Sequence, residues 1–225
     1  MKKNILILAP HADDEILGCG GAISKYKNLG YCTHVLILTN ANIGAPDLYS
    51  EKKINLIRDE AKKANKTIGT QKLYFENLPG LNLNQYPTYK ISNIISKYIL
   101  RIDPEILFIP SANDIHDDHK KIFHASKVAV RPKKKNNLKK ILSYEVLSET
   151  EWNEDEKSFN PNYFVSLKKS DVNNKVKAFL KYKSQVKLFP HPRSKQSIVN
   201  LSKMRGSQAF MQYAEAFRIE KILEY

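Results

Sequence analysis

Short apolar runs alternate with longer amphipathic stretches over the first 150 residues of the chain. The apolar runs are rich in Ile, Leu and Phe, are bounded by polar or turn-forming residues, and have the length of buried strands. They occupy residues 4–10, 33–40, 72–77, 105–111 and 140–146. This alternation predicts βαβ units built on a parallel sheet.

The segments between these runs have the spacing of apolar residues that is typical of helices packed on a sheet. They predict helices near residues 15–29, 50–67, 88–101 and 119–130. The fold class that follows is α/β, with a Rossmann-like, mostly parallel sheet of strand order 3-2-1-4-5 flanked by helices.

The last third of the chain is less regular. A polar loop is followed by helical patterns near residues 171–187 and 195–217. Because there is no internal repeat and no long linker, we expect one domain over residues 1–225. It would consist of a core of residues 1–150 and a C-terminal helical extension of residues 151–225.

The first apolar run ends in a dense polar cluster. The stretch "PHADDE", residues 10–15, places one histidine and three consecutive acids at the edge of the predicted core. Three adjacent carboxylates repel one another, so such a cluster is disfavoured unless a cation offsets it. The alternative is an ordinary helix start, because acids are also favourable near a helix N-terminus.

A second cluster, "HDDH" at residues 116–119, follows the fourth run. In a sheet of order 3-2-1-4-5, ligands bind beyond the carboxyl ends of strands one and four, so both clusters are expected to meet there. His11, Asp14 and His119 would then bind a divalent cation and leave positions open for water and substrate, as in hydrolytic zinc sites. Either cluster alone could be a helix cap; their placement after these two strands favours a metal site.

The remaining polar residues suit proton transfer. Asp13, next to the ligand Asp14, is the candidate general base. His116 is the candidate oxyanion stabiliser and acid, with Asp118 orienting its ring. Such a site would cleave an amide by attack of metal-bound water.

These motifs resemble those of the PIG-L/LmbE-like deacetylases, zinc-dependent enzymes that remove N-acyl groups from amino sugars. The family's first motif stands here as "PHADDE" and its second as "HDDH". The stretches "RDEAKKANKTIG" (58–69) and "RGSQAFMQYAEAF" (205–217) are also similar to family segments. The resemblance implies zinc on His11, Asp14 and His119, with Asp13 as base and His116 supported by Asp118.

The resemblance also implies substrate contacts. Arg58 matches a family arginine that contacts substrate, and "PHPRS" at 190–194 resembles a substrate-side loop, which makes His191 and Arg193 candidates. Three positions depart from the family pattern, and one of them is Ala41, where a glycine is often seen. Ala12 replaces a proline, and Gly80 stands where many members carry a sugar-binding aspartate.

The chain is strongly basic, with 37 Lys plus Arg against 23 Asp plus Glu and a net charge of +14. The densest patch, at 131–140, is mostly lysine, and no nucleic-acid-binding signature accompanies it, which favours a solvated loop. The charge is compatible with an anionic carrier on the substrate. With no apolar run long enough for a membrane span or a secretory signal, we expect a cytoplasmic protein.

The leading hypothesis is a metal-dependent N-deacetylase acting on an acetamido sugar that is nucleotide-linked, lipid-linked or part of a glycan or antibiotic pathway. The alternatives are an amidase of the same fold acting on a small-molecule conjugate, and a non-enzymatic nucleic-acid-binding protein. A dinucleotide-binding oxidoreductase is disfavoured, because "GCGGA" at 18–22 lacks the required glycine spacing. The expected cofactor is Zn²⁺, although two imidazoles and a carboxylate also suit Fe²⁺.

Overall fold

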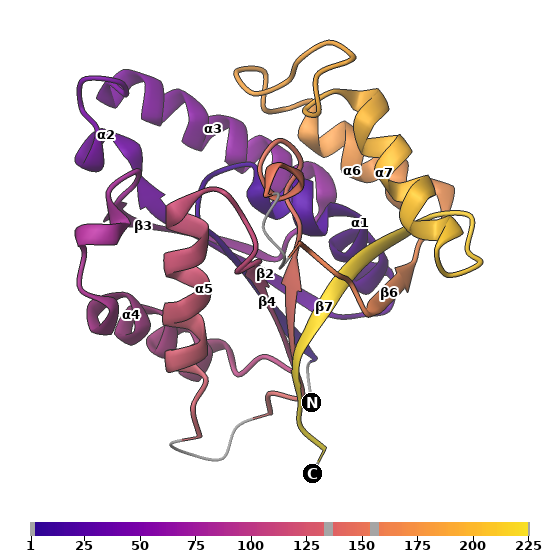
Figure 1. The fold of residues 1–225 in the computed structure, drawn as a ribbon, viewed down its shortest axis with the longest axis horizontal. Helices are drawn as coiled ribbons and strands as arrows, with labels where there is room; N and C mark the ends of the chain where they lie inside the picture. Colours follow the sequence, from indigo (N-terminus) through magenta and orange to yellow (C-terminus); the bar gives the residue numbers. More distant parts are fainter. Residues whose placement is uncertain (1–2, 133–136, 154–157, 225) are drawn as a thin grey trace.

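The computed structural model describes residues 3–132, 137–153 and 158–224. One seven-stranded sheet runs through the molecule in the order β3-β2-β1-β4-β5-β7-β6 (Figure 1). Its strands are β1 (Asn4–Ala9), β2 (Cys32–Asn40), β3 (Lys72–Pro79), β4 (Ile106–Pro110), β5 (Lys140–Tyr144), β6 (Tyr163–Ser166) and β7 (Ala214–Ile222). The first five pair in parallel and β7 is antiparallel to β5 and β6.

Seven α-helices are found among the described residues. They are α1 (Asp14–Asn28), α2 (Ala41–Gly44), α3 (Glu51–Ile68), α4 (Thr88–Ile102), α5 (Asp117–Ala129), α6 (Lys169–Phe179) and α7 (Lys195–Ser207). Short 3₁₀ turns, η1 and η2, lie at Leu83–Gln85 and Thr150–Trp152. Over the described residues, no helix has both the length and the apolar composition that crossing a membrane requires.

The helices cover both faces of the sheet, as the fold prediction required. Helices α1, α3, α6 and α7 lie on one face, and α4 and α5 lie on the other (Figure 1). Successive residues of β1 therefore enter different cores: Ile5 and Ile7 pack toward α1, whereas Leu6 and Leu8 pack toward α4 and α5. Burial on both faces explains why this strand is a continuous apolar run rather than an alternating one.

The predicted strand order 3-2-1-4-5 is confirmed. The C-terminal extension, however, adds two strands as well as two helices to the fold. The helix predicted over 195–217 ends at Ser207, and residues from Ala214 onward form β7. Its alanines favour a helix locally, but pairing with β5 and burial of Phe217 outweigh that preference. In the basic patch at 131–140, residues 133–136 lie outside the described residues.

Helix α1 is tied to the extension by a buried ion pair. The Glu215 carboxylate of β7 accepts hydrogen bonds from the backbone N–H groups of Gly21 and Ala22, at 2.7 and 2.6 Å. The Lys175 ammonium of α6 donates to Glu215 at 2.7 Å and to the Leu17 carbonyl at 2.6 Å. The extension therefore fixes the helix whose first turn carries the acidic cluster.

Replacing Lys175 with methionine is expected to lower the free energy of unfolding by about 3–5 kcal/mol, because Glu215 would stay buried without its partner. Urea denaturation measures the change. The double variant Lys175→Met/Glu215→Gln should lose less than the single one, since it buries no unpaired charge. Lys62→Met, which removes an exposed ion pair with Asp59, serves as the control and should leave the midpoint unchanged. A Lys175→Met protein as stable as the parent would contradict this role.

Candidate metal centre and active site

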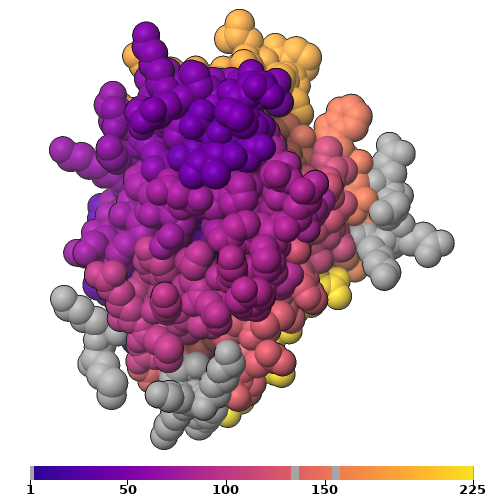
Figure 2. Space-filling view, turned by 90° about the vertical axis from the view of Figure 1, so that its left-hand side faces the viewer, coloured from indigo at the N-terminus to yellow at the C-terminus, as the bar shows by residue number. Residues whose placement is uncertain are grey.

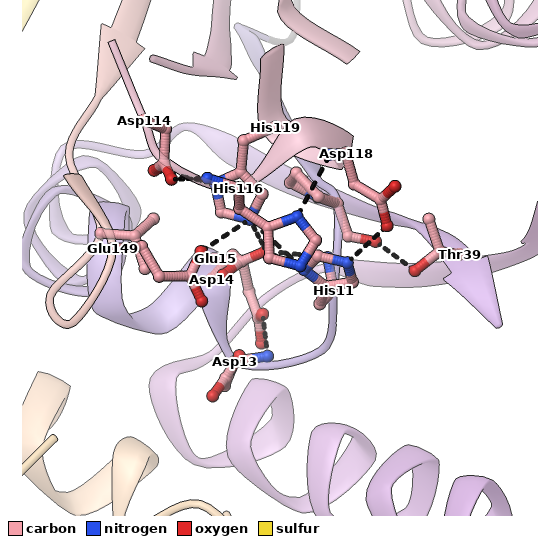
Figure 3. A network of polar contacts seen from close by, with 12 residues as sticks. His11, Asp13, Asp14, Glu15, Thr39, Asp114, His116, Asp118, His119 and Glu149 are labelled. Atoms are coloured by element: carbon pink, nitrogen blue, oxygen red, sulfur yellow. Dashed lines mark hydrogen bonds and ion pairs between the residues drawn. The ribbon is translucent and has the colours of Figure 1, made fainter. Parts of the chain in front are cut away.

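The two polar clusters meet at one edge of the sheet. Strands β1 and β4 are parallel neighbours, so the loops that follow them leave from the same end. Asp14 begins α1 after the first loop, and His119 lies in the first turn of α5 after the second. Figure 3 shows the side chains of both loops pointing toward one another. The predicted convergence of these loops is therefore present.

Three lone-pair-bearing atoms form a nearly equilateral triangle at this edge. His11 Nδ1 lies 3.5 Å from Asp14 Oδ2 and 3.3 Å from His119 Nε2, and His119 Nε2 lies 3.2 Å from Asp14 Oδ2. Ligand atoms about 2.0–2.2 Å from a tetrahedral metal ion are about 3.3–3.6 Å apart, so the triangle fits one divalent cation. The other Asp14 oxygen, Oδ1, is buried with no hydrogen-bond partner among the described residues. Both observations fit a metal centre.

The charges around the triangle also favour a cation. Burial works against ionisation of Asp14, but the neighbouring imidazoles hold its pKa well below the usual value. Burial likewise opposes protonation of His119, yet Asp14 and Asp114 raise its pKa well above that of free histidine. Positive charge at this place is therefore stabilised, and a bound metal ion would supply it.

Each histidine of the triangle is held from behind by a carboxylate. Asp118 Oδ2 lies 2.9 Å from His11 Nε2, and Asp114 Oδ2 lies 3.0 Å from His119 Nδ1. A carboxylate on the far nitrogen fixes the ring's tautomer and orientation, so the near nitrogen presents its lone pair to a metal. Asp114 in turn accepts a hydrogen bond from the Thr150 hydroxyl at 2.9 Å.

The predicted partner of Asp118 was wrong. Its carboxylate orients His11 and accepts from the backbone N–H of Leu81 at 2.6 Å, instead of facing the His116 ring. His116 Nδ1 accepts a hydrogen bond from the Asp118 backbone N–H at 3.1 Å, which leaves the proton of the neutral ring on Nε2. Burial, together with His11 and His119, lowers the pKa of His116 to about 4. His116 is therefore a neutral hydrogen-bond donor at pH 7.

Asp13 has a strained backbone and a buried side chain. Its φ of 111° lies in a region that non-glycine residues rarely occupy, and strain of this kind concentrates at functional sites. The Glu15 carboxylate stabilises this conformation by accepting from the Asp13 N–H at 3.0 Å. Burial raises the pKa of Asp13, and the Arg193 guanidinium, 3.0 Å away, opposes that rise. A carboxylate poised in this way suits a general base.

The three consecutive acids therefore have three separate environments. Asp14 faces the two imidazoles, Asp13 faces Arg193, and Glu15 points into the core, where it accepts from the Tyr182 hydroxyl at 2.6 Å. Burial raises the pKa of Glu15 to about 7, and its hydrogen bonds limit that rise. Asp14 and Glu15 still raise the pKa of Asp13, so repulsion within the cluster persists and is opposed by Arg193 and the two imidazoles.

A pocket opens beside the triangle. It has a volume of about 140 Å³, and the residues around it include Tyr49, Arg58, Leu81, Glu149 and Arg193 in addition to His11, Asp13 and His116. Arg58, on α3, donates to the Glu76 carbonyl at 2.8 Å and to Asn77 Oδ1 at 2.7 Å. Two of the three candidate substrate residues therefore reach the pocket.

The third candidate, His191, does not line this pocket among the described residues. It is exposed, and its Nδ1 accepts from the backbone N–H of Arg193 at 3.0 Å. Arg193 itself pairs with Asp13 and, at 2.8 Å, with Glu149. His191 is thus a turn residue that positions Arg193.

Sequence reasoning missed Asp114 and Glu149. Asp114 belongs to the same polar loop as His119, and Glu149 follows β5, the next strand along the sheet edge. The one feature of the sequence that could have identified them is that each follows a strand, β4 or β5, whose carboxyl end lies at this edge of the sheet. Glu149 Oε2 lies 3.2 Å from His119 Nε2, and with Asp114 these residues make up another group that could hold a metal.

Replacing Asp114 with asparagine is expected to weaken zinc affinity by about 10–100-fold, because His119 loses the carboxylate that orients it. Competition with a fluorescent zinc chelator measures the affinity. Asp117→Asn is the matched control. Asp117 begins α5, the helix that carries His119, but its side chain is exposed and accepts a hydrogen bond from Asn84. Equal zinc affinity in Asp114→Asn and the parent protein would show that Asp114 does not position the ligand.

Comparisons with known proteins agree with this geometry. The chain is 28% identical over 187 residues to the uncharacterized deacetylase YaiS of Escherichia coli K12, covering 81% of this chain and 92% of that protein. It is also 28% identical over 123 residues to the diacetylchitobiose deacetylase of Thermococcus kodakarensis, covering 52% of this chain and 45% of that protein.

Among solved structures, the conserved protein TT1542 of Thermus thermophilus superposes with a TM-score of 0.78 at 22% identity, covering 98% of this chain and 96% of that one. This likeness shows that the fold is shared. The family model described as "PIG-L: GlcNAc-PI de-N-acetylase" matches residues 6–130, a span that holds both polar clusters and most of the strands. The chain therefore belongs to the PIG-L family.

Proposed function

We propose that this protein is a metal-dependent hydrolase that removes an N-acetyl group from an amino sugar or a sugar conjugate. The observation that carries the proposal is the triangle of His11, Asp14 and His119, which adjoins a buried carboxylate and a neutral histidine donor in one pocket. The family of the chain and the names of two deacetylases that are similar to it in sequence support the same reaction.

His11, Asp14 and His119 are the proposed ligands of a Zn²⁺ or Fe²⁺ ion. Such an ion supplies acidification of a water molecule and polarisation of the acetamide carbonyl. Asp118 and Asp114 keep the two ligand rings in place. The donor set of two imidazoles and one carboxylate suits either metal.

The chain's own residues carry the protons. Asp13 takes a proton from the attacking water and later delivers it to the departing amine, so that acetate and a free amino group are formed. Because the neutral His116 ring donates from Nε2, it would stabilise the negative charge that develops on the carbonyl oxygen. The strained, hydrogen-bonded backbone of Asp13 holds its carboxylate at the pocket.

Arg58 and Arg193 are the proposed substrate-binding residues. Both line the pocket. Arg58 donates to Glu76 and Asn77 from one guanidinium nitrogen, and its other N–H groups suit hydroxyl, carbonyl or anionic groups of a sugar conjugate. Arg193 donates to Ser148, Asp13, Gln185 and Glu149, so its proposed role is to shape the pocket beside the base. Arg193 also pairs with Asp13, so substrate binding and orientation of the base are coupled. His191 contributes to this site through the turn that positions Arg193.

A single domain over residues 1–225 is also proposed. The extension of residues 151–225 supplies β6 and β7 to the same sheet, and its Lys175 and Glu215 bind helix α1. Separation of the extension from the core would leave β5 with an unpaired edge and α1 with an uncovered face.

An acetate-release screen of the purified protein tests the proposed function. N-acetylated amino sugars and their conjugates should release acetate, treatment with a chelator should abolish release, and added Zn²⁺ or Fe²⁺ should restore it. Amides of small-molecule thiol conjugates form the comparison set. Turnover of those amides alone would favour the amidase alternative, and release that survives full metal removal would overturn the proposal.

A further inference from the structure

The region from the middle of α6 to the start of β7 is devoid of acidic residues. Residues 172–214 include seven lysines and two arginines but not one Asp or Glu. Lys175 and the arginines are neutralised by carboxylates elsewhere in the chain, through the pairs with Glu215, Asp13 and Glu145. The other six lysines are exposed and have no ion pair within the described part of the chain. The segment from α6 to α7 therefore carries six exposed lysines, and the Glu60 carboxylate of α3, which accepts from Ser184, is buried.

The loop between α6 and α7 exposes two large apolar side chains within this charge. Leu188 is 89% exposed and Phe189 is 55% exposed. In Figure 1 this loop projects beyond the helices at the top of the molecule, and in Figure 2 orange atoms of this part of the chain stand out at the top edge. Exposed Leu and Phe side chains at a projecting tip lower solubility, so their presence indicates an apolar partner.

Three lysines line the same groove as these two side chains. This shallow groove between the loop and α7 is lined by Leu188, Phe189 and Val199 together with Lys187, Lys195 and Lys203. Apolar side chains ringed by lysines are the pattern of proteins that lie on a membrane surface. There the apolar groups enter the headgroup region and the ammonium groups contact lipid phosphates.

We propose that the loop of residues 180–194 and the adjoining face of α7 dock on the surface of an anionic phospholipid membrane. Leu188 and Phe189 insert, while Lys187, Lys195 and Lys203 bind the phosphates of the lipids. A nucleic acid fits less well, because both arginines of the region are engaged internally and solvent-exposed aliphatic groups gain little against a phosphate backbone. The inference does not depend on the proposed function.

Docking there would also place the active-site pocket close to the membrane. The base of the same loop supplies Gln185 and Arg193 to the pocket lining. Arg193 joins the loop to Asp13, so the membrane-facing tip and the candidate base belong to one connected segment.

Co-sedimentation of the full chain with lipid vesicles tests this inference. The protein should bind vesicles that contain phosphatidylglycerol and phosphatidylcholine, and should bind pure phosphatidylcholine vesicles much more weakly. Two double variants remove the apolar and the basic groups separately: Leu188→Ser/Phe189→Ser and Lys187→Gln/Lys195→Gln. Each should lower the partition coefficient onto the anionic vesicles roughly tenfold or more. Thermal melting of each variant verifies that it is folded.

Matched control variants distinguish binding through this particular surface from binding driven by the overall charge or exposed apolar area of the protein. Leu29→Ser/Leu100→Ser removes two exposed side chains elsewhere in the fold, one just after α1 and one on α4. Lys63→Gln/Lys66→Gln removes two exposed lysines of α3. Both should bind like the parent protein. Equal losses in the two lysine variants would mean that net charge alone drives binding, equal losses in the two apolar variants would mean that any exposed apolar side chain does, and either result would overturn the proposal. Failure to bind anionic vesicles, alone or together with tight, salt-dependent binding of duplex DNA, would also overturn it.

Discussion

Replacing Asp13 with asparagine is expected to lower kcat for acetate release by about 10²–10⁴-fold and leave the metal content unchanged. Asparagine has nearly the same shape as aspartate but cannot take a proton from water. Asp13 contacts Arg193 and not the atoms of the metal triangle, so the ligands should stay in place. Steady-state kinetics together with elemental analysis of the same preparation measure both quantities.

Asp13→Ala should behave in the same way as Asp13→Asn. The control is Asp59→Asn, which replaces an exposed carboxylate of α3 and should retain full activity. Arg193→Gln separates the base from its partner. It should raise KM by weakening substrate binding while kcat falls less than in Asp13→Asn. A rate within threefold of the parent in Asp13→Asn would refute the assignment of the base.

Replacing His119 with alanine is expected to remove both the bound metal and the activity. His119 supplies one of the three triangle atoms, and each of the other two lies within 3.3 Å of its Nε2. With only His11 and Asp14 left, the cation loses a ligand and the arrangement that holds the others together. Elemental analysis should find less than a tenth of the parent's metal content.

His124→Ala provides the control for this variant, because His124 lies on the same helix α5 but is exposed. It should keep its metal and its acetate release. Since His119 is fully buried, thermal melting of the chelated parent protein gives the reference for folding without metal. A folded His119→Ala protein that binds one metal ion per chain and remains active would contradict the proposed ligand set.

The position of the site could be predicted because it depends on topology. Two polar clusters followed two apolar runs, and parallel strands in the order 3-2-1-4-5 bring the ends of those runs together. His11, Asp14 and His119 meet for that reason. No knowledge of side-chain rotamers was needed, since the loops are short and begin at fixed places.

The details within the site depend on geometry that the sequence does not specify. Asp118 could have faced either His11 or His116 from its place in the second cluster, and the hydrogen bonds that its carboxylate accepts from the backbone N–H groups of Leu81 and Leu83 hold it toward His11. Asp114 and Glu149 carried no spacing that separated them from ordinary loop acids. The Glu15 carboxylate, two residues along the chain, holds the positive φ of Asp13 through the Asp13 N–H, and Arg193, which comes from a distant part of the chain, holds its side chain.

The C-terminal strand was missed for a different reason. The stretch "AEAF" at 214–217 has local preferences that favour a helix, and only the open edge of β5 makes it a strand. No pattern in the sequence marks Lys175 and Glu215 as buried, yet both bind the backbone of α1 in the interior. Long-range pairing decided both features.

The central claim is that His11, Asp14 and His119 hold one divalent cation. Anomalous diffraction at the zinc absorption edge, from crystals grown with zinc, tests it most directly. The strongest peak is expected inside the triangle of His11 Nδ1, Asp14 Oδ2 and His119 Nε2. A strongest peak among Asp114, His119 and Glu149, or no peak beside these histidines, would contradict it.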